Sequence, residues 1–270
     1  MSGCSTCDSC EPSRSASQAS VQLGFDLDVD RFDAVVALAG NPNTGKSTVF
    51  NALTGLRQHT GNWPGKTVSR AEGLFVYAAK RFKLVDLPGT YSLLSNSTDE
   101  EIARDFLLFG SPDCTVVVCD ATVLERNLNL VLQILSITDR VVVCANLIDE
   151  ANRKRIALEA RAIEKELGVP VVPTAARKAQ GLDHLQQHIL EVATGQRVNQ
   201  PKLPSLQPQL QAAVDELVPE LLSLVPGLPC PQWVAMRLLE DDQKIEQALR
   251  DGSLAELVQR LSARQGQAVA

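Results

Sequence analysis

The chain has 270 residues, a formal net charge of -6 and a sequence pI near 5.2, and apolar residues make up 44% of it. This length and apolar content predict one large domain with a sizeable core and a second, smaller unit. The acidic balance, without a long lysine and arginine cluster, argues against a nucleic-acid-binding surface. There is no secretory leader and no apolar run of about eighteen residues, so the chain as given is expected to be soluble and cytoplasmic.

The cysteines fall into two groups. Cys4, Cys7 and Cys10 form a C-x-x-C-x-x-C run within a Ser/Pro/Gln-rich stretch, and residues 1–30 are predicted to be a disordered tail and lead-in. These thiols could hold a soft metal or form disulfides, although no fourth ligand lies near them. Thiols inside apolar runs are instead predicted to be buried, and these are Cys114, Cys119 and Cys144.

From Asp33 onward, apolar runs alternate with segments of helical periodicity. The predicted strands are Ala34–Ala39, Arg70–Tyr77, Arg81–Asp86, Cys114–Cys119, Arg140–Ala145 and Val169–Pro173. The predicted helices are Lys46–Thr54, Asp99–Phe109, Glu125–Thr138, Glu150–Leu167 and Leu182–Ala193. Such alternation predicts an α/β domain with a mostly parallel six-stranded sheet and ligand-binding loops at the carboxyl ends of its strands.

Beyond the proline-containing connection from Arg197 to Pro208, only helical patterns follow. They cover Gln209–Leu224, Gln232–Glu240, Gln243–Arg250 and Ser253–Gln265. We therefore expect three parts: the tail at 1–30, an α/β domain at 31–196 and a small helical domain at 197–270.

The stretch from Gly40 to Ser47 fits the pattern G-x-x-x-x-G-K-[ST] of a phosphate-binding loop, with a strand before it and an amphipathic helix after it. The glycines let the backbone wrap closely around a polyphosphate, and amide groups at the helix N-terminus point at it. Lys46 is expected to reach the outer phosphates. The Ser47 hydroxyl is expected to bind a magnesium ion.

Two further motifs follow strands. Asp86-Leu-Pro-Gly89 fits D-x-x-G, in which the carboxylate can orient magnesium and the glycine amide can bind the γ-phosphate. Asn146-Leu-Ile-Asp149 fits N-x-x-D, and the Asp149 carboxylate can accept two hydrogen bonds from the N1–H and amine of guanine. Adenine would leave this carboxylate unpaired, so guanine is the expected base.

Thr174-Ala175-Ala176, after the last strand, resembles a backbone loop that contacts the guanine oxygen. In isolation each motif has a simpler explanation, since DLPG can form a turn and NLID an Asn-capped helix start. Four motifs in this order, each at a strand end, favour a guanine nucleotide site.

With these motifs, residues 33–193 resemble the small GTPases of the translation-factor-like class. GNPNTGKST, the G-N-W-P-G run that begins at Gly61, and DLPGTYSL resemble more closely the cytoplasmic GTPase domain of the FeoB family of prokaryotic ferrous iron transporters. The resemblance implies a Ras-like P-loop GTPase domain, a following helical domain and then a membrane permease segment as partner. It places the chain at the cytoplasmic face of the inner membrane and leaves a homo-oligomer open.

The resemblance also implies residue roles. Thr67 would be the first-switch threonine that binds magnesium, together with Ser47 and Asp86, and Asn43 would bind a potassium ion that supplies charge in place of an arginine finger. Hydrolysis would involve Asn43, Lys46, Thr67 and Gly89. The expected contacts to GTP or GDP are Gly40, Asn41, Asn43, Thr44, Gly45, Lys46, Ser47, Thr48, Thr67, Asp86, Gly89, Asn146, Asp149, Thr174, Ala175 and Ala176.

Two positions depart from common GTPase patterns. Leu147 replaces a lysine that packs along the base, and Thr90 replaces the water-orienting glutamine of Ras-like enzymes, so intrinsic hydrolysis is expected to be slow. The stretch from Leu56 to Val68 is expected to be a loop that orders on triphosphate. Within it Trp63 is expected to pack as an anchor. His59 is expected to be a solvated residue, not an iron ligand.

Three functions remain open at this point: a GTP-hydrolysing switch of an iron transporter, a GTP/GDP sensor without turnover, and a GTPase of ribosome or tRNA maturation. The GTP-hydrolysing switch is the leading hypothesis, and the missing glutamine at Thr90 keeps the sensor open as an alternative. The acidic balance argues against the third.

Overall fold

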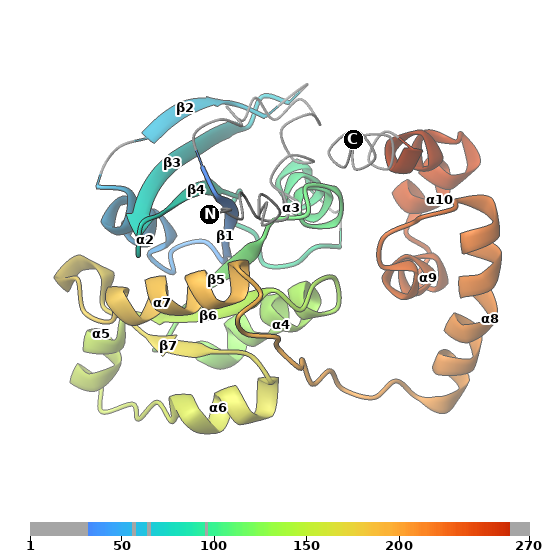
Figure 1. The fold of residues 1–270 in the computed structure, drawn as a ribbon. Coiled ribbons are helices and arrows are strands. Elements are labelled where there is room, and N and C mark those ends of the chain that lie inside the picture. The colour runs from blue at the N-terminus through green and yellow to red at the C-terminus, as the bar shows by residue number, and fades with distance from the viewer. Residues whose placement is uncertain (1–31, 56–57, 64–65, 95–96, 260–270) are drawn as a thin grey trace, which may run out of the picture.

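The computed structural model of the chain describes residues 32–55, 58–63, 66–94 and 97–259. Within these ranges, helices cover a seven-stranded sheet on both faces, and a further group of helices lies beside it (Figure 1). The predicted tail with Cys4, Cys7 and Cys10 lies outside the described residues, as does the end of the last predicted helix.

The sheet has the strand order β2-β3-β4-β1-β5-β6-β7. The strands are β1 (Ala34–Gly40), β2 (Gln58–Asn62), β3 (Ser69–Tyr77), β4 (Lys80–Asp86), β5 (Cys114–Asp120), β6 (Val141–Asn146) and β7 (Val171–Pro173). Parallel pairing joins β4, β1, β5, β6 and β7, while β2 and β3 are antiparallel to their neighbours. The mostly parallel α/β sheet predicted from the sequence is therefore confirmed, with one strand more than the six expected.

The additional strand is β2, which lies inside the stretch predicted to be a loop. It pairs with β3 in a register that sets Gln58 opposite Gly73 and Asn62 opposite Ser69. Residues 59–62 are exposed. Because β2 is an edge strand without a buried face, its polar sequence carries no alternation of apolar residues from which it could be recognised.

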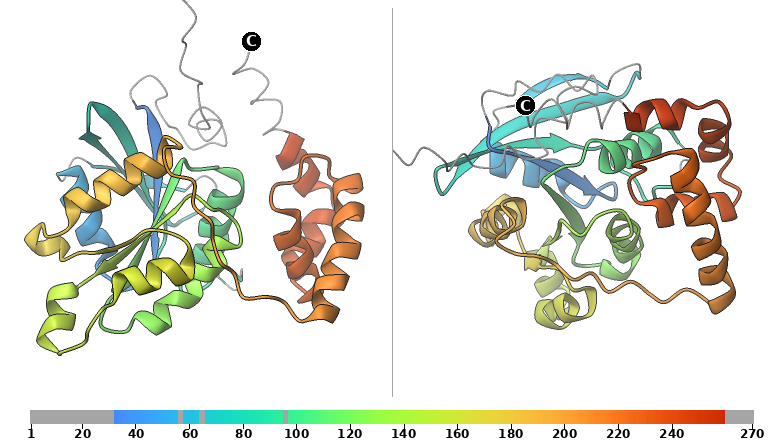
Figure 2. Two further views of the ribbon diagram at one scale, coloured as in Figure 1. Left: turned by 60° about the horizontal axis from the view of Figure 1, so that its bottom comes forward. Right: turned by 45° about the vertical axis from the view of Figure 1, so that its right-hand side comes forward.

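Two layers of helices flank the sheet (Figures 1 and 2). On one face lie α2 (Lys46–Thr54) and α7 (Leu182–Ala193), and on the other lie α3 (Thr98–Phe109), α4 (Leu124–Leu135) and α6 (Ala160–Leu167). The central strand β1 is buried along its whole length, as expected for a parallel strand covered on both faces. The three cysteines in the apolar runs, Cys114, Cys119 and Cys144, are fully buried, as predicted.

The single helix predicted at Glu150–Leu167 is wrong, because two helices occupy this region. The first is α5 (Ile148–Arg153), and α6 begins at Ala160. Arg155 takes a left-handed conformation with φ of 58°, which ends the first helix. Ile156 has the helical spacing to Ala160, Ile163 and Leu167 expected of a buried face, but it lies in the connection and is 37% exposed.

The helical part of the chain lies beside α3 and α4 (Figure 2). It contains α8 (Pro208–Leu224), α9 (Pro231–Leu239), α10 (Gln243–Arg250) and a helical segment at 253–259. An extended strap, residues 197–207, connects it to α7. Asn199 fastens the strap to the sheet, since its Nδ2 donates to the carbonyls of Asp139 and Val141 at 2.7 and 2.9 Å.

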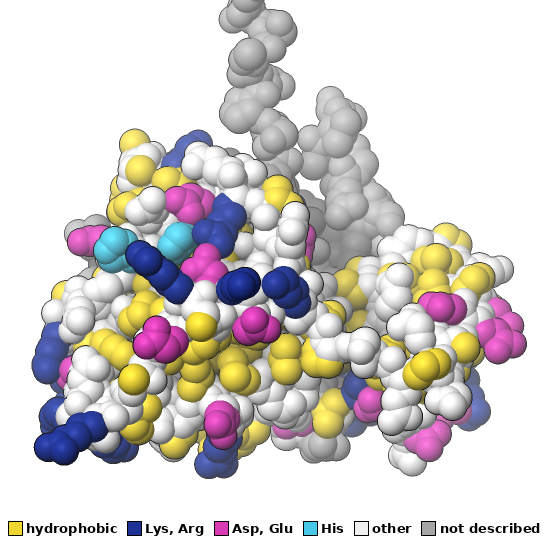
Figure 3. All heavy atoms as spheres, turned by 90° about the horizontal axis from the view of Figure 1, so that it is seen from below, with side chains coloured by type: hydrophobic (Ala, Val, Ile, Leu, Met, Phe, Trp, Pro, Cys, Tyr) yellow, Lys and Arg dark blue, Asp and Glu magenta, His cyan; other side chains and the backbone are white. Residues whose placement is uncertain are grey.

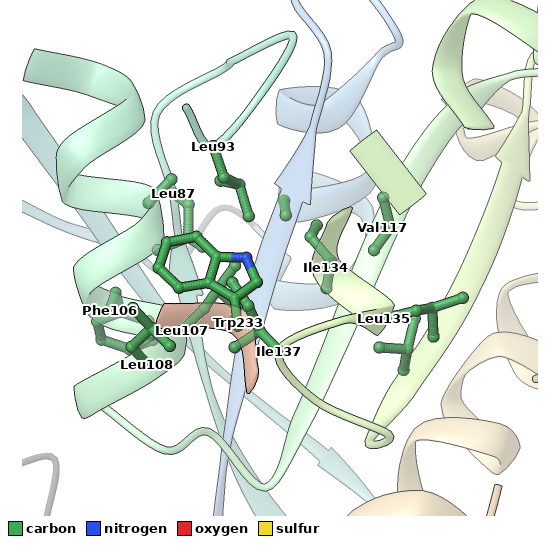
Figure 4. Packing of buried hydrophobic residues seen from close by; sticks show 14 of the residues in the cluster. Leu87, Leu93, Phe106, Leu107, Leu108, Val117, Ile134, Leu135, Ile137 and Trp233 are labelled. Atoms are coloured by element: carbon green, nitrogen blue, oxygen red, sulfur yellow. The ribbon is translucent and has the colours of Figure 1, made fainter. Parts of the chain in front are cut away.

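One hydrophobic cluster joins the helical part to the α/β part. Trp233 of α9 lies beside Phe106 and Leu107 of α3 and Ile137, which follows α4 (Figure 4). The Cys230 thiol adds a hydrogen bond of 2.8 Å to the carbonyl of Ile137. The two parts therefore share a continuous core.

Charged groups of both signs lie side by side on the face of the molecule shown in Figure 3, not as a patch of one sign. Among the described residues, no helix combines the length and the apolar character needed to cross a bilayer.

Candidate nucleotide-binding site

The predicted motifs meet at one edge of the sheet. The phosphate loop follows β1, the D-x-x-G motif begins at the end of β4, and the N-x-x-D motif begins at the end of β6. The loop Thr174-Ala175-Ala176, called the TAA loop below, follows β7. Since β4, β1, β6 and β7 all run in the same direction, their carboxyl ends lie at the same edge, where open α/β sheets bind ligands.

The phosphate loop is a tight, internally bonded turn. Asn43 and Gly45 adopt left-handed conformations with φ of 68° and 80°, and α2 begins at Lys46. The Thr44 hydroxyl donates to the carbonyl of Asn41 at 2.9 Å. Turns of this kind form concave arrangements of backbone amides that suit an anion, and the positive end of α2 adds to them.

Lys46 connects this loop to the motif after β4. Its Nζ forms an ion pair with the Asp86 carboxylate and donates to the carbonyl of Leu87 at 2.7 Å. Both charged side chains are largely buried. Burial raises the pKa of Asp86, while the charge and hydrogen bond of Lys46 act in the opposite direction.

The segment after Asp86 packs directly on the phosphate loop. A Cβ at Gly89 would lie 3.6 Å from Pro42, and the amide of Thr90 donates to the carbonyl of Gly40 at 3.2 Å. The Thr90 hydroxyl is buried and donates to the carbonyl of Ser92 at 2.5 Å. This threonine therefore holds the local turn, and its hydroxyl is committed to the backbone.

The Asn146 side chain forms hydrogen bonds to two loops of the site, the phosphate loop and the loop after β7. Its Nδ2 donates to the carbonyl of Thr44 at 3.0 Å, and its Oδ1 accepts from the amide of Ala176 at 3.1 Å and the hydroxyl of Thr174 at 3.4 Å. A Cβ at Gly45 would lie only 2.4 Å from the same Nδ2, so the glycine is required both by its φ and by this contact. Asn146 thus fixes the phosphate loop relative to the loop Thr174-Ala175-Ala176.

Asp149, the residue expected to read the base, lies in the first turn of α5. Its Oδ2 is 2.9 Å from the Nζ of Lys178. The hydrogen bond from Lys178 holds the pKa of Asp149 below its usual value, so the carboxylate is ionised at neutral pH. Sequence reasoning did not identify Lys178. The basic pair Arg177-Lys178 in the loop after β7 is the signal that would have drawn attention to it.

The remaining predicted residues lie around this centre. Ser47 is exposed and Thr48 half-buried in the first turn of α2, while Ala175 is buried beside Ala176. Asn41 is buried, and its Oδ1 has no hydrogen-bond partner among the described residues. Thr67 is exposed between β2 and β3, and no side-chain hydrogen bond links it to the phosphate loop within the part of the chain that is described.

Trp63 confirms the expected packing role. It is 2% exposed, lies edge-on to Phe106 at 5.6 Å, and has the Arg70 guanidinium 5.5 Å from its ring centre. His59 is exposed on β2, as expected for a solvated residue. No group of three or more His, Cys, Asp or Glu side chains suited to a metal ion occurs among the described residues.

Comparison with known proteins agrees with this geometry. The family model described as ferrous iron transport protein B matches residues 34–189. The Fe(2+) transporter FeoB of Escherichia coli (strain K12) is 40% identical over 211 residues, which cover 77% of this chain and 27% of the relative. That of Methanocaldococcus jannaschii is 38% identical over 219 residues, which cover 81% and 32%. The chain thus spans about a quarter to a third of the length of these relatives.

Two solved structures cover most of the chain. The cytosolic domain of T. maritima FeoB, in apo form, matches with a TM-score of 0.75 and 33% identity, covering 87% of this chain and 97% of that one. The cytosolic domain of L. pneumophila FeoB matches with a TM-score of 0.74 and 36% identity, covering 87% and 94%. The T. maritima domain has also been solved in GDP and GMPPNP forms. Motifs, fold and relatives agree, and the chain belongs to the ferrous iron transport protein B (FeoB) family.

Proposed function

We propose that this chain binds GTP and GDP, hydrolyses GTP slowly, and acts as the cytoplasmic nucleotide switch of a ferrous iron transporter. The observation that carries the proposal is the pair of hydrogen bonds from the Asn146 side chain to the phosphate loop and the TAA loop. They hold both loops at fixed positions beside Asp149. The GDP and GMPPNP forms of the T. maritima domain support the same ligand class.

Guanine is the base we assign to Asp149. The ionised carboxylate can accept the N1–H and the exocyclic amine of guanine together, whereas adenine offers neither group at these positions. The polyphosphate would lie on the loop from Gly40 to Ser47, with Lys46 leaving its contacts to Asp86 and Leu87 to reach the outer phosphates.

The donor set also fits magnesium. The Ser47 and Thr67 hydroxyls and the Asp86 carboxylate are hard oxygen donors of the kind that magnesium prefers, and Asp86 lies beside the phosphate-binding Lys46. When bound, the ion would neutralise charge on the phosphate oxygens. Asn43, exposed at the tip of the loop, offers an amide oxygen that suits a potassium ion.

In this proposal, hydrolysis is an in-line attack of water on the γ-phosphate. Lys46 and the Gly89 amide stabilise the charge that develops there. Thr90 does not orient the water, because its hydroxyl is bound to the carbonyl of Ser92. This loss of a positioned side chain is the reason for slow intrinsic turnover. It also favours a second candidate, a GTP/GDP sensor without turnover.

We further propose residues 31–196 as the GTP-binding domain and residues 197–270 as a helical domain that precedes the membrane permease segment. The length of the FeoB relatives supports this arrangement, since the chain matches 27% of the Escherichia coli transporter. The permease part of the same transporter would be the partner of the switch.

The test is phosphate release from GTP in the presence of magnesium, with potassium and sodium compared at matched ionic strength and ATP as the control nucleotide. We expect turnover with GTP that potassium stimulates, and none with ATP. Asn43→Ala should remove the stimulation and leave GDP binding intact. GTP binding without multiple turnover in either salt would support the sensor instead.

A further inference from the structure

The loop after β7 closes on itself and sets the position of Lys178. The backbones of Ala175 and Gln180 exchange two hydrogen bonds of 3.1 and 3.3 Å, and the amide of Lys178 donates to the carbonyl of Ala175 at 2.8 Å. Ala176 is held from the other side by its bond to Asn146. The loop is thus a constrained turn, and the base of the Lys178 side chain has a fixed place beside α5.

From this turn, Lys178 reaches the base-reading carboxylate. Its Nζ lies 2.9 Å from Oδ2 of Asp149, and its side chain is 62% exposed. A second cation near Asp149 is Arg153 at the end of α5, and it forms an ion pair with Glu150 at 3.7 Å. Among the described residues, Lys178 is therefore the cation hydrogen-bonded to Asp149.

Guanine requires the same carboxylate. A guanine base donates its N1–H and its exocyclic amine to the two oxygens of one carboxylate, and an ammonium group hydrogen-bonded to Oδ2 competes with one of these donors. We propose that Lys178 competes with guanine for Asp149 and thereby lowers the affinity of the chain for guanine nucleotides. This inference rests on the proposed function and names a residue that adjusts affinity at the same site.

The expected effect is small, because an exposed lysine and carboxylate gain little from pairing. Exposed ion pairs of this kind change equilibria by up to about fivefold. Replacing Lys178 with an uncharged side chain should therefore tighten GDP binding about two- to fivefold. If Lys178 instead contacted the nucleotide, its removal would weaken binding.

The first experiment measures GDP affinity by calorimetry for the wild-type chain, Lys178→Met and Arg177→Met. Methionine keeps most of the aliphatic stem of lysine and removes the charge. Arg177 is the matched control, since it is an exposed cation one residue away in the same turn. We expect tighter binding for Lys178→Met alone. Unchanged or weaker binding in this variant, or an equal gain in Arg177→Met, would overturn the inference.

A second experiment repeats the substitution without the carboxylate. Asp149→Asn should prefer XDP, because the asparagine side-chain amide NH2 can donate to the xanthine 2-oxygen. In this background Lys178 has no carboxylate to occupy, so adding Lys178→Met should leave XDP affinity unchanged. A gain that persists would show that Lys178 acts elsewhere. Failure of the wild-type chain to bind GDP would instead overturn the proposed function, so the two failures are distinguishable.

Discussion

In the proposed nucleotide site, Lys46 is the residue on which we expect phosphate binding to depend most directly. Lys46→Ala should lower the affinity for a GTP analogue about 10- to 100-fold, because a charge-assisted hydrogen bond to phosphate is lost. Calorimetry with the analogue measures this loss. Guanosine, which has no phosphates, is the control ligand and should bind the variant and the wild type alike. A variant that keeps the wild-type affinity for the analogue would contradict the role given to Lys46.

A second residue, Asp113, predicts a pH dependence of stability. It is fully buried, its Oδ2 accepts from the amide of Val35 at 2.8 Å, and burial raises its pKa to about 6. Since the unfolded carboxyl has a pKa near 3.8, the folded state binds the proton more tightly. This contribution is fully present below about pH 4 and is lost as the pH rises to about 6, at a cost on the order of 3 kcal/mol.

Asp113→Asn should remove this contribution. The difference in unfolding free energy between wild type and variant should therefore change between about pH 4 and pH 6 and stay constant above that range. Urea denaturation at several pH values measures it. A constant difference across the whole range would mean that Asp113 does not titrate in this window.

That the motif residues meet at one edge of the sheet could be predicted from the sequence, because each motif lies at the end of a strand and has a fixed spacing. Lys46, Asp86 and Asn146 are of this kind, since the parallel sheet alone brings the strand ends together. The contact between Lys178 and Asp149 could not be predicted. It depends on how the turn from Ala175 to Gln180 closes, and the sequence pattern does not specify that closure.

At the scale of elements, the turn after α6 shows how the strap is fastened. Gly168 ends α6 with φ of 74°, and a Cβ there would lie 1.8 Å from the carbonyl oxygen of Gln200 in the strap. Gly168→Ala should cost about 3 kcal/mol of unfolding free energy, from the left-handed backbone and the clash together. Chemical denaturation measures the loss.

Gly195 supplies a matched control for this substitution. Its φ is 73°, nearly the same as that of Gly168, but a Cβ there meets no atom within 4 Å. Gly195→Ala should therefore cost only about 1 kcal/mol, which is the backbone contribution alone. Equal losses in the two variants would show that the approach of the strap does not account for the glycine.

The elements themselves were predictable where burial produces a clear period. The apolar runs of β1 and β6 and the amphipathic patterns of α2 and α7 have the bounds expected from the sequence to within about two residues. The edge strand β2 has no buried face, so its sequence shows no alternation of apolar and polar residues. α5 is separated from α6 near Arg155, which has a left-handed backbone. Because no glycine or proline lies at this position, the sequence gives no signal of the helix end.

At the scale of the molecule, the shared core predicts that the two parts unfold together. Trp233 is 6% exposed within the cluster that contains Leu87 and Leu93, near the phosphate loop, and Phe106 of α3. Trp233→Ala should cost about 3 to 5 kcal/mol, because it opens a cavity in this joint. Denaturation followed by circular dichroism should show a single, shifted transition.

The control for this variant is Leu224→Ala, at an apolar residue of α8 that is 65% exposed. It should change stability by less than about 0.5 kcal/mol. Two separate transitions in the wild-type chain would contradict the continuous core.

The strap limits how far the helical part can separate from the α/β part. Lys202 is its last residue with a backbone hydrogen bond to the α/β part, at 3.0 Å to Leu167, and α8 begins at Pro208. The remaining tether, residues 203–207, includes the partly buried Leu206, and its five residues can span at most about 18 Å. A short tether keeps its two ends at an effective concentration in about the millimolar range. A detached helical part would therefore rebind quickly, whereas a single proteolytic cut in the tether would make the same contact bimolecular and concentration-dependent.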